Sequence, residues 1–228
     1  SNTTRRGSIY NITSQSWING VDNTGLRGTL LWKPSDDFKL TLATDWNNQD
    51  ANCCAQYFAR VGVTQRPLNR QFNSLARALN YEPPSRNAFD RVTDVDAPLR
   101  AKNELGGAAL TAEWNVGGGT VTSITSWRYW DWRPKNDRDF TGLPVSPLSQ
   151  NPTHQNQYSQ EVRYAYAAEN YDFVVGVFGF QQGIRTRGQE SNGPAASRFS
   201  LNPGNVAVGA PGCATPTTLA CNPAVLNN

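Results

Sequence analysis

The sequence predicts an all-β fold, an antiparallel segment of a transmembrane β-barrel. Three observations carry this prediction: several segments alternate apolar with polar residues, tryptophans lie near the ends of those segments, and short connections alternate with long ones. Alternation with a period of two is typical of strands that have a different solvent on each face. Short turns at one rim and long loops at the other are typical of outer-membrane barrels.

The clearest alternation lies in residues 24–46, TGLRGTLLWKPSDDFKLTLATDW. The apolar residues of its two strands fall on one face: Leu26, Leu30, Trp32, Phe38, Leu40, Leu42 and Trp46. Residues 34–37 form a tight turn, because the proline presets φ and the aspartates bond to the local backbone. Trp32 lies beside this turn and Trp46 lies at the far end, as expected of aromatic girdles at the two edges of a membrane.

The pattern recurs along the whole chain, 1–228, and we expect about seven strands, at roughly 5–12, 24–33, 38–47, 104–116, 120–133, 157–167 and 171–185. Long extracellular loops are expected at 48–103, 134–156 and 186–228. In the fifth strand Val121 and Ile124 fall on opposite faces, so we expect a β-bulge between them. Because membrane barrels begin at about eight strands, a closed barrel needs strands from outside this chain.

The first long loop combines a predicted helix with a basic character. Residues 67–80 carry apolar side chains at helical spacing, which indicates a short amphipathic helix: Leu68, Phe72, Leu75 and Leu79. Arg66, Arg70 and Arg77 lie in the same stretch. Clustered arginines suit an anionic ligand through charge-assisted hydrogen bonds, but equally lipopolysaccharide phosphates or a solvated surface.

Composition narrows the class of protein. Hydrophobic residues make up 38% of the chain and the mean hydropathy is −0.58. No stretch approaches the roughly 20 apolar residues of a transmembrane helix. A net charge of +3 without a basic run does not indicate a nucleic-acid partner. The chain has no methionine and no signal-peptide start, so we expect a piece of a longer protein.

Cysteine and histidine give little support to a metal site or an enzyme. Cys213 and Cys221 are the better disulfide candidate, whereas Cys53 and Cys54 pair with each other, pair elsewhere or stay free. One histidine and no CxxC spacing exclude a typical zinc site. His154 has aspartates nearby, at 137 and 139, but no serine or cysteine nucleophile is placed with it, so we expect no catalytic residues.

The two faces of the predicted strands have different candidate roles. Tryptophans of the apolar face are expected in the membrane girdles: Trp32, Trp46, Trp114 and Trp127. Charged residues of the other face are expected in the barrel lumen: Arg27, Lys39, Asp45, Glu113, Glu161 and Arg163. These charges either line a substrate path or simply pair across strands. Trp130 and Trp132, close to the loops, are candidates for ligand binding because aromatic rings stack on sugars and on siderophore catechols.

Four segments together resemble a known family. Residues 25–46, 120–129 (TVTSITSWRY), 158–164 (YSQEVRY) and 171–180 (YDFVVGVFGF) resemble barrel strands of TonB-dependent outer-membrane receptors, in the family's order. The resemblance spans roughly residues 5–185. It implies a Gram-negative outer-membrane barrel of about 22 strands, filled by a plug domain. The chain itself contains no recognisable plug or TonB box.

The resemblance also implies a function. Such receptors take up scarce nutrients with energy from the TonB complex, which acts through the plug, and they need no cofactor. A ferric siderophore or similar chelate is the favoured ligand, so iron transport is the favoured process, with an oligosaccharide next. The partners implied are the rest of the barrel, the plug, outer-membrane lipid and lipopolysaccharide. A passive porin and a soluble carbohydrate-binding β-sandwich remain the alternatives.

Overall fold

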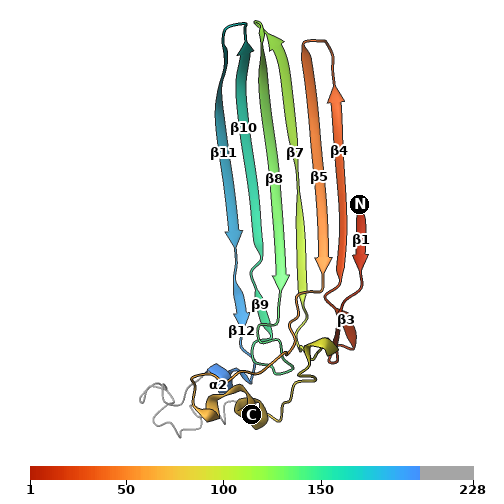
Figure 1. Ribbon diagram of the computed structural model, residues 1–228, viewed down its shortest axis with the longest axis vertical. Helices are drawn as coiled ribbons and strands as arrows, with labels where there is room; N and C mark the ends of the chain where they lie inside the picture. Colours follow the sequence, from red (N-terminus) through yellow and green to blue (C-terminus); the bar gives the residue numbers. More distant parts are fainter. Residues whose placement is uncertain (201–228) are drawn as a thin grey trace.

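A computed structural model describes residues 1–200, most of which form one antiparallel sheet (Figure 1). Its seven strands follow the order β1-β4-β5-β7-β8-β10-β11. Their bounds are β1 (Asn2–Arg5), β4 (Val21–Trp32), β5 (Phe38–Ala51), β7 (Arg100–Val116), β8 (Gly119–Lys135), β10 (Thr153–Ala167) and β11 (Asp172–Thr186). The predicted antiparallel β fold is confirmed, and in the described part of the chain the sheet is open.

The connections alternate in length as predicted. Residues 33–37, 117–118 and 168–171 make three short turns that lie together at one end of the sheet, the top in Figure 1. The β7–β8 turn depends on Gly117 and Gly118, whose φ angles of 63° and 81° are rarely adopted by residues with a side chain. The long connections gather at the opposite end, which we call the loop end.

The predicted β-bulge in the fifth strand is absent, and that expectation was wrong. β7 and β8 pair without interruption from Arg100 opposite Lys135 to Val116 opposite Gly119. Val121 therefore lies opposite Trp114 and Ile124 opposite Thr111, on the two different faces of the sheet. The strand is thus regular, and it carries Ile124 on the side opposite to Val121.

The predicted first strand, 5–12, is also wrong in its extent. β1 ends at Arg5, and β2 (Ile9–Asn11) belongs to a separate three-stranded sheet with β3 (Ser16–Ile18) and β6 (Val92–Thr93). Gly7 separates the two strands at a close approach of backbone, since a Cβ there would lie 2.3 Å from the carbonyl oxygen of Ile18. The remaining short strands, β9 (Leu148–Gln150) and β12 (Gln189–Ser191), pair with each other.

The helix predicted at 67–80 is two shorter helices, η1 (Leu68–Arg70) and α1 (Phe72–Ala78). Gln71 between them is extended, which breaks the helical spacing. Leu75 is consequently buried as predicted, whereas Leu68 is 82% exposed. Two other helices are described, η2 (Ala88–Asp90) and α2 (Ala196–Ser200). None of the helices in residues 1–200 has the length and apolar character needed to cross a membrane.

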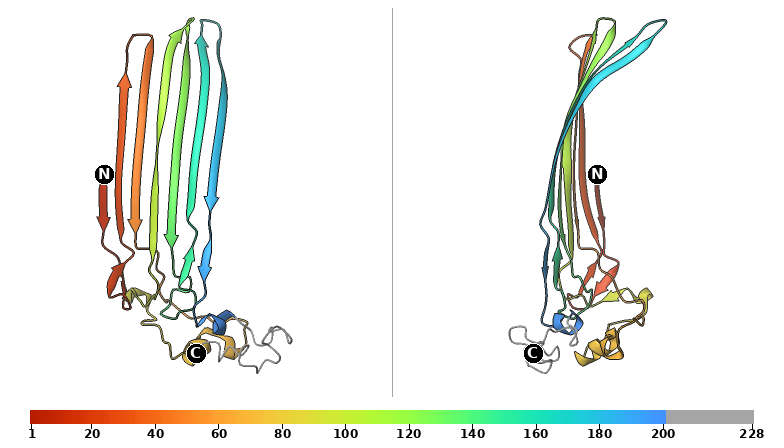
Figure 2. Two further views of the ribbon diagram at one scale, coloured as in Figure 1. Left: turned by 180° about the vertical axis from the view of Figure 1, so that it is seen from behind. Right: turned by 90° about the vertical axis from the view of Figure 1, so that its left-hand side faces the viewer.

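The buried core lies at the loop end and not in the sheet. It consists of Ile9, Ile18, Ala55, Val95 and Leu99, with Phe140 packed against them. The sheet is a single layer that bends towards its short-turn end (Figure 2). A β-sandwich would need a second sheet over the apolar face, and residues 1–200 supply none.

Candidate functional site

Strand register gives the sheet an apolar face. Residues opposite each other in an antiparallel pair project to the same side. The side that carries Leu30, Leu42 and Leu110 in one row also carries most of the large apolar residues of the sheet. This apolar face comprises Leu26, Leu30, Trp32, Phe38, Leu40, Leu42, Trp46, Leu110, Trp114, Val121, Trp127, Tyr158, Val162, Tyr164, Phe173, Val175 and Val177. It is open to the surroundings: Leu26 is 66% exposed and Val177 is 73% exposed.

Aromatic side chains occupy both ends of the apolar face. Near the short turns, Trp32 meets Phe38 edge-on with ring centroids 6.5 Å apart. Towards the loop end, Trp127 stacks on Tyr129 at 5.4 Å, and Trp46 Nε1 donates to Glu104 Oε1 at 3.2 Å. All four tryptophans predicted for the girdles lie on this face: Trp32, Trp46, Trp114 and Trp127.

The two aromatic rows lie several residues apart along the strands. Trp114 lies six residues along β7 from Ala108, the partner of Trp127, and eight from Gly106, the partner of Trp46. At about 3.3 Å per residue the rows are roughly 20 to 26 Å apart along the strand. With the strand tilt of about 40° found in outer-membrane barrels, this is roughly 15 to 20 Å along the barrel axis, which is less than the apolar band of about 25 Å.

A small polar cluster interrupts the apolar face between β8 and β10. Gln160 Nε2 donates to Ser123 Oγ at 2.9 Å, and Thr125 Oγ1 donates to Gln160 Oε1 at 2.5 Å. Because these polar groups bond to one another, they lower the cost of facing an apolar solvent. The cluster is therefore compatible with a lipid-facing surface.

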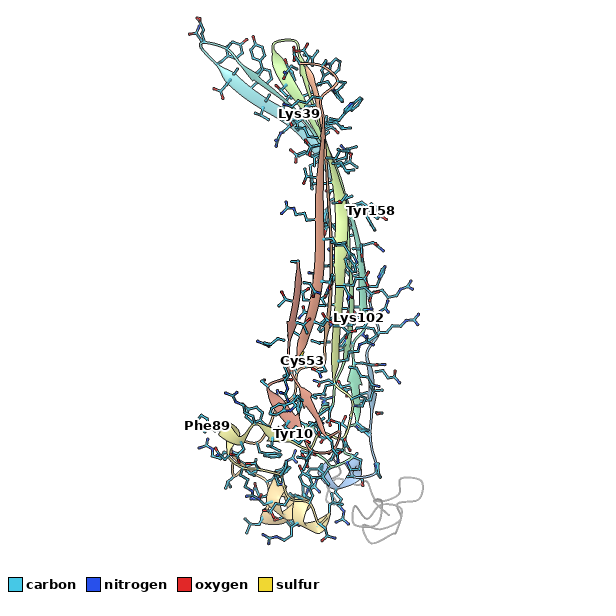
Figure 3. The ribbon with its side chains drawn as sticks, turned by 90° about the vertical axis from the view of Figure 1, so that its right-hand side faces the viewer. Tyr10, Lys39, Cys53, Phe89, Lys102 and Tyr158 are labelled. Atoms are coloured by element: carbon cyan, nitrogen blue, oxygen red, sulfur yellow. A yellow bond between two sulfur atoms is a disulfide. The ribbon has the colours of Figure 1, made fainter. Side chains whose placement is uncertain are left out.

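The opposite side of the sheet, the polar face, carries all six charged residues predicted for the lumen. Five of them are ion-paired. Lys39 Nζ lies 2.6 Å from Glu113 Oε2, and Arg163 Nη1 lies 3.0 Å from Glu161 Oε1. Figure 3 shows Lys39 near the short-turn end. These contacts are the cross-strand and same-strand pairing that hydrated, partly exposed charges make at small net gain.

Arg128 is a charged residue of the polar face that the sequence interpretation missed. Its guanidinium donates to both carboxylate oxygens of Asp45, at 2.8 and 2.9 Å, although β7 lies between the two strands. The intervening residue is Gly107, where a Cβ would come within 3.0 Å of Arg128 Cγ. The contact depends on the register of three strands, which aligns Asp45, Gly107 and Arg128 in one row, and no local sequence pattern reveals that register.

Trp130 and Trp132 lie on the polar face, at its loop end. Trp130 is the cross-strand partner of Leu105, and its Nε1 donates to Asn103 Oδ1 at 2.5 Å. The same face also carries apolar residues of β11 that the sequence interpretation did not single out. Phe178, the partner of Glu161, is 67% exposed and stacks against Phe180 with centroids 6.5 Å apart.

The three predicted ligand-binding arginines lie in the first long loop. Arg70 is engaged with the chain itself, donating to the carbonyl oxygens of Arg198 at 2.7 Å and Phe199 at 3.3 Å. Arg77 lines a cavity of about 410 Å³ together with Arg86. Arg66 precedes η1. The described residues show no hydrogen bond or ring contact between these arginines and Trp130 or Trp132, so the structure does not join the two sets.

Two further expectations concern residues with reactive side chains. Cys53 and Cys54 are joined by a disulfide, close to where the sheet meets the loops (Figure 3). The proposed Cys213–Cys221 pair lies outside the described residues. His154 faces Asp131, with Nδ1 3.9 Å from Oδ2, and bonds to Asn156 at 2.8 Å.

Comparison with known proteins supports the fold. No family model and no curated protein matches the sequence. Among solved structures, the ferric yersiniabactin uptake receptor FyuA from Yersinia pestis aligns with 84% of this chain at a TM-score of 0.59 and 13% sequence identity. The chain spans 26% of that receptor's length. The antiparallel sheet thus resembles part of a β-barrel receptor, and the predicted fold class is confirmed to that extent.

Proposed function

We propose that this chain is part of the wall of a TonB-energised outer-membrane receptor that imports a scarce nutrient. The observation that carries the proposal is the two-faced sheet. One face is an exposed apolar band with aromatic residues at both ends, and the other is polar and ion-paired. Such alternation is what a barrel needs when lipid lies outside and water or a plug lies inside.

Solvation energy favours a lipid environment for the apolar face. Each Å² of apolar surface left in water forfeits about 25 cal/mol, and soluble monomers rarely expose large continuous apolar patches. In a bilayer the same surface is solvated by acyl chains. The strand ladders satisfy the backbone groups of the interior strands, which is the condition for crossing a membrane as a sheet. Further strands, outside the described residues, would close the edges.

The favoured nutrient is a ferric siderophore or similar chelate, and iron transport is the favoured process. Arg66 and Arg77 provide cationic groups in the long loop, suited to an anionic chelate. The structural relative with a known ligand is a receptor for a ferric siderophore, ferric yersiniabactin. An oligosaccharide is the second candidate, favoured by the two indoles of Trp130 and Trp132 on the polar face.

The remaining partners follow from this role. The chain would contact outer-membrane lipid and lipopolysaccharide on its apolar face and the plug on its polar face, with TonB acting through the plug. We assign no catalytic function to it. A Gram-negative outer-membrane location belongs to the same proposal.

Uptake of iron-labelled siderophore by cells tests the proposal. We expect disruption of the gene to abolish uptake of one ferric siderophore, and loss of TonB to abolish it equally. Uptake that persists without TonB, together with high single-channel conductance of the purified protein, would instead establish a passive porin.

A matched pair of variants tests the ligand face. Trp130→Ala, on the polar face, should weaken ligand binding to the cells, since it removes an aromatic surface near the loops. Trp127→Ala, on the apolar face, should leave binding unchanged. Equal behaviour of the two variants would exclude Trp130 from the ligand site.

A further inference from the structure

Asp137, in the second long loop, is a fully buried carboxylate with one oxygen unused. Its side chain is 0% exposed. Oδ1 accepts hydrogen bonds from the backbone N–H groups of Asp139 at 2.9 Å and Phe140 at 3.0 Å. Oδ2 is buried and has no hydrogen-bond partner in the described part of the chain. A buried carboxylate oxygen without a partner is costly, so its environment calls for a ligand.

The unused oxygen belongs to a cluster contributed by both long loops. The Asp96 carboxyl, from the first long loop, lies within hydrogen-bonding reach of Asp137. Asp94 and Asp139 lie close to this pair. The charges of both raise the pKa of Asp96, and the charge of Asp139 also raises the pKa of Asp94. The two loops also meet through their backbones, since the N–H of Asp96 donates to the carbonyl oxygen of Thr141 at 3.3 Å.

Basic side chains do not compensate this cluster. Burial and, after it, the nearby charges of Asp139 and Asp96 raise the pKa of Asp137 to about 7. Burial likewise raises the pKa of Asp94 and of Asp96. The groups that shift the pKa values of these three carboxyls most include no lysine or arginine. The neighbouring Arg138 is ion-paired with Glu190.

The other two acids of the cluster are already engaged. Asp139 Oδ1 accepts from the Thr141 backbone at 3.1 Å, and its Oδ2 accepts from the Ser146 backbone at 2.7 Å. Asp94 Oδ1 accepts from the Tyr81 hydroxyl at 3.1 Å. These two residues therefore shape the loops, and Asp137 Oδ2 remains the buried oxygen of the cluster that has no hydrogen-bond partner among the described residues.

We propose that Asp137 Oδ2 and the Asp96 carboxylate bind one divalent cation, Ca²⁺, which ties the first long loop to the second. Calcium accepts carboxylate, backbone carbonyl and water oxygens in flexible geometry. Residues 1–200 contain no set of three or more acidic, histidine or cysteine side chains arranged to hold a metal, so water and backbone oxygens complete this site. Oxygen donors alone favour calcium over zinc, and the irregular loop geometry favours it over magnesium.

Calorimetric titration of the purified full-length protein with CaCl₂, after EDTA treatment, tests the site. We expect a dissociation constant of about 10⁻⁴ to 10⁻³ M, as in other modules outside the cell. Asp96→Asn and Asp137→Asn should each weaken binding by about tenfold or more, because each removes one of two charged ligands. Asp96 is exposed, so Asp96→Asn tests the site without threatening the fold.

A protease measurement separates a specific contact between the two loops from nonspecific binding. Calcium should slow trypsin cleavage after Arg86 and Arg91 in the first long loop, and should do so in the matched control Glu82→Gln, whose side chain is 82% exposed.

Three results would overturn the proposal: no calcium binding by the wild type at concentrations well above about 10⁻³ M, unchanged affinity in Asp96→Asn, or equal binding of MgCl₂. The first would mean that Asp137 and Asp96 share a proton instead. The titration contains no nutrient, so failure of the calcium site leaves the proposed transport function untouched.

Discussion

The sheet and the loop end place their apolar residues in opposite ways. In the sheet, large side chains such as Leu30 and Val177 are 65% and 73% exposed. At the loop end, Val95 and Ile9 are 1% and 3% exposed in a small core. The loop end buries its apolar residues as a water-soluble domain does, whereas the sheet leaves them exposed. The proposed membrane location would place the exposed residues in an apolar solvent.

The largest effect should come from a charge on the apolar face. Leu42→Arg lies in the middle of the band, where a lipid-facing arginine costs about 2–4 kcal/mol. Thr41→Arg, one residue away on the polar face, should cost far less. Unfolding by urea from lipid vesicles measures both. Equal costs would remove the distinction between the faces.

A methyl group in the path of Arg128 should have the next largest effect. In Gly107→Ala the new Cβ would lie 2.3 Å from the carbonyl oxygen of Trp127, so the strands must shift and the Asp45–Arg128 pair is disturbed. We expect a loss of about 1–3 kcal/mol. Gly28→Ala is the control, since its nearest neighbour is a side-chain oxygen at 3.3 Å. The same vesicle assay reports on both, and an unaffected Gly107→Ala would argue against this pairing.

A substitution in the buried core of the loop end should destabilise that region and leave the sheet unchanged. Val95→Ala removes two buried carbons and should cost about 2 kcal/mol, whereas Val63→Ala, at a site 90% exposed, should cost almost nothing. Hydrogen exchange should speed up in 88–99 and remain unchanged in β4 and β5. Faster exchange throughout the sheet would show that the two regions are not independent.

The smallest effect should come from the Lys39–Glu113 pair. The side chains of Lys39 and Glu113 are both more than a third exposed, at 39% and 34%. A double-mutant cycle with Lys39→Gln and Glu113→Gln should therefore give a coupling of about 0.2–1 kcal/mol that shrinks in high salt. A salt-independent coupling of several times this size would mean that the polar face is dry.

Sequence reasoning located the strands best where one face had to be apolar. The predicted strands 24–33 and 38–47 alternate with few exceptions, such as Leu31 on the polar face, and β4 and β5 cover most of these residues. Where the strands approach the loop end, as at Lys102 and Asp50, both faces are polar and alternation vanishes, so their extension was missed. β2 depends on pairing with residues 92–93, which no local pattern reveals.

The site was only partly predictable for related reasons. The six lumen candidates share the polar face because alternation alone fixes their side. The contact of Arg128 with Asp45 and the position of Phe178 opposite Glu161 depend on strand register, which no local pattern reveals. The burial of Asp137 depends on how two distant loops meet, and no spacing in the sequence encodes that.

The central claim is that one face of the sheet contacts lipid. Solvent accessibility at adjacent residues of β7 tests it most directly. Nitroxide labels would be attached at Leu110→Cys, on the apolar face, and Thr111→Cys, on the polar face, in full-length protein whose own cysteines are replaced by serine. In lipid vesicles the label at position 110 should be relaxed by oxygen, which concentrates in lipid, and protected from a water-soluble nickel chelate. The label at position 111 should show the reverse or be covered. A label at position 110 that is open to the nickel chelate would contradict a lipid-facing sheet.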